Sequence, residues 1–154
     1  MLIGRTTADL VRNLFVVLLM TVVGYLVGFR VETDVLSFLA GVALVLLFSY
    51  ALSWGFAVVG LVAENAEAAQ LMSFPVLLPL VFASSTFVRP ETMPGWLQGF
   101  VNNQPVTHTV NAVRDLLIDY SVDPGALWKA VLWAFGLLLV LVPLAVRRFR
   151  RTMV

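Results

Sequence analysis

The sequence is poor in charge. Only 12% of its 154 residues are Asp, Glu, Lys or Arg, whereas soluble globular domains carry roughly 25%. So few charges cannot cover a water-facing surface of this size. The remaining composition is 60% hydrophobic, with a mean hydropathy of +0.95. These values predict an integral membrane protein that is surrounded by a lipid bilayer.

Several kinds of site are excluded by residues that the sequence lacks. Without cysteine there is no disulfide, no thiolate metal site and no cysteine nucleophile. A single histidine cannot form a metal site with several histidine ligands. The nucleotide-binding motif G-x-x-x-x-G-K-[ST] does not occur, and a net charge of +1 provides no basic stripe for nucleic acid. We expect no cofactor and no nucleic-acid partner.

Catalysis is not expected in this chain. Ser84, Ser85 and His108 are the only residues that suggest a nucleophile and a base, and their spacing matches no hydrolase motif. We interpret His108 as a polar residue at the membrane interface that bonds a backbone carbonyl.

Four apolar runs predict the membrane-spanning helices. They cover about 14–29, 36–63, 71–88 and 127–146. The third run contains Pro75 and Pro79, each of which removes a backbone donor and loosens the helix. The predicted fold is an all-α integral membrane protein with four transmembrane helices in a single domain, residues 1–154.

The segment 89–123 is too amphipathic for a full span and too apolar for a solvated loop. Apolar residues recur at helical spacing over 96–101 and again over 106–117, with Pro105 between the two groups. This pattern predicts two short helices within about 94–120, interfacial or re-entrant, before the last span.

The orientation follows from the basic end of the chain. Residues 147–151 contain four arginines next to a predicted span, and such clusters stay in the cytoplasm. Counting back through four spans puts both termini in the cytoplasm. We expect the membrane to be the plasma membrane, which is the inner membrane of a bacterium. The short helices then lie on the extracytoplasmic side.

Each group of charged residues near the ends of the spans has more than one interpretation. Arg5, Asp9 and Arg12 are juxtamembrane anchors or a docking surface for a partner. Glu64 and Glu67 form a solvated cytoplasmic turn or a docking spot, in preference to a proton relay. Arg114 and Asp115 fix the second short helix at the outer surface or contact a substrate.

Several motifs together resemble one family of membrane proteins. They are Gly4-Arg5, Asp9 and Arg12 before a span that ends in Gly28-Phe29-Arg30; Ala63-Glu64-Asn65-Ala66-Glu67-Ala68-Ala69-Gln70; Phe87-Val88-Arg89-Pro90-Glu91-Thr92-Met93-Pro94-Gly95-Trp96-Leu97; Asn103-Gln104-Pro105-Val106-Thr107-His108; and Arg114-Asp115-Leu116. In this order they resemble the permease subunits of type-2 ATP-binding-cassette exporters, in particular the daunorubicin/doxorubicin-resistance-like branch.

The resemblance implies a function and two protein partners. A second permease copy, as a homodimer or heterodimer, and a cytoplasmic ATP-binding-cassette ATPase would export a lipophilic drug, lipid or polysaccharide. The ATPase would meet the first residues of the chain, so the candidate coupling residues are Arg5, Asp9, Arg12, Glu64 and Glu67. The short helices would cap the outer mouth of the pathway, with Pro90, Pro94, Trp96, Pro105, His108, Arg114 and Asp115 as the candidate outer gate.

The resemblance also implies a difference in length. Permeases of this family usually have six spans, and the present sequence corresponds to the last four, so we expect it to lack the first two. The alternative function is that of a non-transporting membrane assembly factor or a degenerate permease fragment.

Overall fold

The computed structural model describes residues 2–30, 33–84, 86, 90–118 and 125–152, and most of these residues are helical. The elements are α1 (Leu2–Val27), α2 (Val35–Val62), α3 (Ala66–Phe82), the 3₁₀ turn η1 (Pro90–Thr92), α4 (Gly95–Asn103), α5 (Pro105–Ile118) and α6 (Ala126–Thr152). The predicted all-α fold is confirmed. The predicted break at Pro105 is also found, because α4 ends at Asn103 and α5 begins at Pro105.

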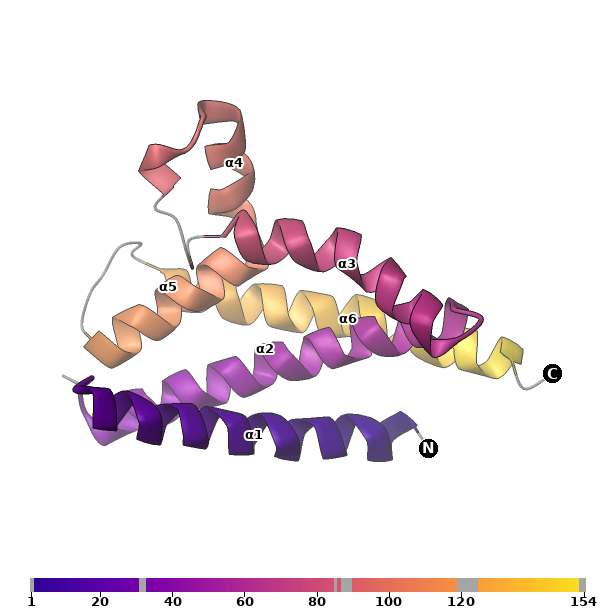
Figure 1. The fold of residues 1–154 in the computed structure, drawn as a ribbon, viewed down its shortest axis with the longest axis horizontal. Coiled ribbons are helices and arrows are strands. Elements are labelled where there is room, and N and C mark those ends of the chain that lie inside the picture. Colours follow the sequence, from indigo (N-terminus) through magenta and orange to yellow (C-terminus); the bar gives the residue numbers. More distant parts are fainter. Residues whose placement is uncertain (1, 31–32, 85, 87–89, 119–124, 153–154) are drawn as a thin grey trace.

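The three long helices lie side by side, with α2 in contact with α1, α3, α5 and α6 (Figure 1). Their apolar stretches are Thr7–Val27, Val35–Val62 and Ala126–Phe149. Each has at least the roughly 20 residues that a bilayer crossing requires. Both chain termini lie at the same end of the bundle, which is the arrangement expected for an even number of crossings.

The third predicted span is shorter than expected. We predicted residues 71–88, whereas α3 has 17 residues and ends at Phe82, and residues 87–89 lie outside the described part of the chain. Ser84 explains the early end. Its Oγ lies 2.6 Å from the carbonyl oxygen of Val81 and 2.7 Å from Oγ1 of Thr86. Such local side-chain bonds compete with the helical ladder.

Small residues form the buried face of α6. Ala126, Ala130 and Ala134 follow one another at four-residue intervals on α6, and all three are buried. On α2, a Cβ atom at Gly55 would lie 3.6 Å from Leu141 of α6. Small side chains allow helix backbones to approach closely, which is how helices gain packing energy in lipid, where no hydrophobic effect draws them together.

Candidate functional site

Apart from Ser84, the buried polar side chains of the described residues gather on α5 and at its start. Gln104, Thr107, His108, Thr109 and Asn111 are each at most 9% exposed. These side chains are buried because α5 packs against both α2 and α6. α5 therefore lies against the long helices, and its depth in the membrane, interfacial or re-entrant, stays a prediction. His108 is 5% exposed, because the face of α5 that bears it is turned into the bundle. Its position at the membrane interface stays a prediction.

The end of α3 and the start of α5 meet at Gln104. The side-chain amide nitrogen of Gln104 donates a hydrogen bond to the carbonyl oxygen of Ala83, and it lies 3.2 Å from Oγ1 of Thr107. A helix end leaves backbone carbonyls without partners, and within a membrane these must be satisfied by protein groups. Figure 1 shows that α3 ends about midway along the bundle and that α5 begins there. α3 and α5 each cover part of the length of the bundle.

Two further contacts hold the other end of α5. Oγ1 of Thr33, in the turn between α1 and α2, donates a hydrogen bond of 2.5 Å to the carbonyl oxygen of Leu116. A terminal nitrogen of Arg114 lies 3.4 Å from the carbonyl oxygen of Thr86. The helix is thus tied to the ends of two other helices, and its position depends on where both of them lie.

The candidate gate residues fall into two groups. Pro105, His108, Arg114 and Asp115 all belong to α5, where His108 is buried and the other three are half-buried. Pro90, Pro94 and Trp96 belong to the arm formed by η1 and α4, which stands away from the long helices in Figure 1. The indole of Trp96 is 79% exposed. The fold therefore does not bring the seven residues into one cluster.

The sequence prediction omitted the polar residues that surround His108. Gln104, Thr107 and Asn111 share its helical face, at intervals of three and four residues. Oε1 of Gln104 is buried without a hydrogen-bond partner among the described residues. A polar stripe at helical spacing between two apolar runs is the signal that identifies this face. Among the described residues, no group of three or more His, Asp or Glu side chains is placed to hold a metal ion.

The candidate coupling residues lie at one end of the bundle. Asp9 and Arg12 are on the first turns of α1, where Arg12 is exposed, and Arg5 belongs to the same helix. Glu64 and Glu67 are exposed at the turn between α2 and α3. In Figure 1 this turn, the start of α1 and the end of α6 are found at the same end. The five positions can therefore face one partner.

Comparison with known proteins identifies the family. Residues 1–118 match the family described as ABC-2 type transporter. The chain belongs to this family. The matched part includes α1 to α5, so α5 and its polar stripe are within the ABC-2 domain.

Curated ABC transporter proteins are similar over most of the chain. The sequence is 36% identical over 154 residues, 97% of the chain, to the daunorubicin resistance ABC transporter permease protein DrrB1 of Streptomyces coeruleorubidus. It is 28% identical over 94% of the chain to the probable doxorubicin resistance ABC transporter permease protein DrrC of Mycobacterium tuberculosis. The chain spans 52% of the length of each of these two proteins. No solved structure matches it significantly.

Membership of the ABC-2 family and the three long apolar helices together make the chain a multi-pass membrane protein. The resemblance that the sequence motifs indicated is confirmed, down to the daunorubicin- and doxorubicin-resistance permeases.

Proposed function

We propose that this ABC-2 chain is a membrane-spanning permease subunit of an ATP-binding-cassette exporter. It would move a lipophilic drug, lipid or polysaccharide out of the cell, with energy from ATP hydrolysis by a separate subunit. The observation that carries the proposal is the 36% identity, over 97% of the chain, to a protein named as a drug-resistance permease. Because the chain spans about half of that relative, export by the whole assembly is part of the proposal.

In this proposal both termini face the cytoplasm, in the plasma membrane of a bacterium. The arginines of residues 147–151 lie at the C-terminal end of α6, across the end of its apolar stretch Ala126–Phe149, and positive charge at the end of a span favours the cytoplasmic side. The ATPase would dock at the same end, on Arg5, Asp9, Arg12, Glu64 and Glu67. A second permease copy would complete the membrane pathway.

A conformational change at the ATPase would reach the outer side of the membrane through α2 and α3. Both helices begin or end at the turn that contains Glu64 and Glu67, and α3 leads to the contact between Ala83 and Gln104. ATP binding to the partner would favour one of two packings of these helices. Because α5 is bonded to the end of α3, a shift of α3 would displace the polar stripe and the η1–α4 arm above it.

Co-purification from native membranes tests this function. A tagged chain, extracted in mild detergent, is expected to bring down an ATPase with a Walker motif. Cells that carry the chain and this ATPase should accumulate less of at least one labelled lipophilic compound than cells with a Walker-lysine variant of the ATPase. Recovery of no ATPase from native membranes would contradict the proposal.

A further inference from the structure

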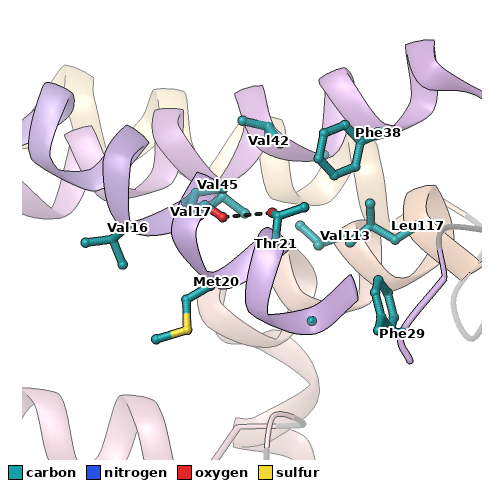
Figure 2. Close-up of a pocket in the computed structure, with 12 residues that line it drawn as sticks. Val16, Val17, Met20, Thr21, Phe29, Phe38, Val42, Val45, Val113 and Leu117 are labelled. Atoms are coloured by element: carbon teal, nitrogen blue, oxygen red, sulfur yellow. Dashed lines mark hydrogen bonds between the residues drawn. The ribbon is translucent and has the colours of Figure 1, made fainter. Parts of the chain in front are cut away.

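The C-terminal end of α6 combines exposed apolar side chains with positive charge. Arg147 and Arg148 are exposed there, and with Arg150 and Arg151 of the sequence they form the arginine cluster. The apolar groove between α1, α2 and α5 differs in this respect. Its lining has no charged residue, and its one polar side chain, Thr21, is hydrogen-bonded within α1 (Figure 2). Only a charged surface can select among lipids by their headgroup charge.

The two described arginines lie on the face of α6 that is turned away from the other helices. Leu144 is exposed, and Arg147 and Arg148 follow it at i+3 and i+4, the spacing that places residues on one helical face. The packed face of the helix continues instead through Ala145, which is buried, to Phe149, which is half-buried. The arginines therefore prolong the exposed apolar stripe of α6.

The length of α6 places the arginine cluster at the edge of the hydrocarbon layer. The apolar stretch Ala126–Phe149 has 24 residues and is about 36 Å long, which is slightly more than the roughly 30 Å of a bilayer core. The helix continues to Thr152, so its last turns reach beyond that core. Arginine side chains at such a helix end extend into the headgroup layer.

The charge of the cluster indicates which neighbour fits it. Residues 126–152 contain four arginines and one lysine but no aspartate or glutamate, so α6 does not neutralise its own charge. Two copies that paired symmetrically through this face would bring their arginine clusters together, and like charges disfavour such an interface. The phosphates of anionic lipids have the complementary charge, and guanidinium groups bind phosphate in a bidentate manner.

We propose that the arginine cluster binds anionic phospholipids of the surrounding bilayer. Their acyl chains lie along the exposed stripe that ends at Leu144, and their phosphates lie at Arg147 and Arg148. Basic clusters directly next to a transmembrane helix attract anionic lipid, and each arginine raises the local preference about fivefold. The bound lipids hold this end of α6 at the headgroup layer.

Fluorescence quenching by brominated lipids tests the proposal. The sequence contains no cysteine, so Leu144→Cys carries a single fluorophore on the exposed stripe. The full chain is reconstituted in phosphatidylcholine vesicles with a minor fraction of brominated phosphatidylglycerol or brominated phosphatidylcholine. At low salt we expect the phosphatidylglycerol to quench this label several-fold more strongly. The difference should shrink at high salt, because ions screen the attraction.

Two other label positions are the matched controls. Leu71→Cys places the fluorophore at an exposed position of α3, at the same end of the bundle but near Glu67. Met20→Cys places it on the uncharged lining of the groove in Figure 2. The two brominated lipids should quench each of these labels equally, because the arginine cluster is on another helix.

Replacing the arginines separates the effect of charge from that of helix position. Arg147→Gln, Arg148→Gln, Arg150→Gln and Arg151→Gln, combined in the Leu144→Cys chain, should abolish the preference for phosphatidylglycerol. The corresponding four lysine replacements keep the positive charge and should retain most of the preference. Both combined variants should unfold at the temperature of the parent in a neutral detergent, which shows that they are folded.

Three results would overturn the proposal. Equal quenching by the two lipids at Leu144→Cys would show that the cluster does not select anionic lipid. A preference that survives the four glutamine replacements would show that another part of the chain attracts the lipid. Protection of the label from both lipids, together with cross-linking to another polypeptide, would show that a protein covers the cluster. None of these results depends on whether the chain takes part in export.

Discussion

The side-chain amide of Gln104 donates a hydrogen bond to the main-chain carbonyl of Ala83, and this contact joins the last turn of α3 to the first turn of α5. Gln104 is 4% exposed, and it stands at the break between α4 and α5. Consequently two partial helices that are 21 residues apart in sequence are held end to end at the middle of the bundle. The polar stripe of α5 begins at this junction.

Removing the Gln104 side-chain amide should destabilise the chain. Gln104→Leu keeps a similar volume but leaves the carbonyl of Ala83, a half-buried residue, without this donor, at a cost of about 1 kcal/mol. Thermal unfolding in detergent measures the loss. Gln98→Leu is the matched control, because Gln98 bonds within its own arm, to the carbonyl of Met93 at 2.8 Å, and is less buried. Equal losses for the two variants would contradict the role of the junction.

Gly41 should tolerate a methyl group but not a ring. A Cβ atom there would lie 3.7 Å from Cδ2 of Leu117, an ordinary contact, so Gly41→Ala should be neutral or stabilise α2 by up to about 1 kcal/mol. Gly41→Phe should cost about 1–3 kcal/mol through overpacking of α2 against α5. Gly60→Phe provides the comparison, since no atom lies within 4 Å of a Cβ at Gly60. Unfolding curves of the three variants measure the effect, and equal stability of Gly41→Phe and Gly60→Phe would contradict the close packing of α2 against α5 at Gly41.

Ala130 should resist enlargement for a related reason. It is fully buried where α6 belongs to a cluster with Leu44 of α2 and Ala112 of α5. Ala130→Leu would push α6 away and should cost about 1–3 kcal/mol. Gly136→Leu on the same helix meets no atom within 4 Å of its Cβ and should leave the unfolding temperature within a few degrees of the parent. A similar fall for both would show that α6 is not packed as described.

The absence of cysteine makes the orientation directly measurable. Single variants Asp34→Cys and Glu64→Cys place one thiol at each end of α2, at exposed positions. With both termini in the cytoplasm, a membrane-impermeant maleimide added to intact cells should label Asp34→Cys alone. Glu64→Cys should react only after the membrane is opened. The reverse pattern would invert the proposed topology.

Charge at the turn between α2 and α3 should govern ATPase binding. Reversal at Glu64 and Glu67, as Glu64→Lys with Glu67→Lys, should reduce co-purified ATPase several-fold, because it removes the charge complementarity that a docking surface at these exposed positions would use. Asp34→Lys reverses a charge at the opposite end of α2 and serves as the control. Equal recovery from both would place the docking surface elsewhere.

The sequence alone determined the fold class, the number of apolar helices and the break at Pro105. Those features depend on local properties: the length of an apolar run, the missing donor of proline and the polar residues at the ends of each run. The family likeness was equally visible, because its motifs are contiguous stretches of sequence.

Tertiary structure decided how far α3 extends, that His108 and Asn111 are buried, and that the gate residues belong to two separate groups. The reason is that a helical pattern defines which residues share a face but not which helix covers that face. For α5 the cover is α2 and α6, whose alanines and glycines allow close approach. Small residues of this kind look alike whether they face lipid or another helix, so only the assembled bundle distinguishes them.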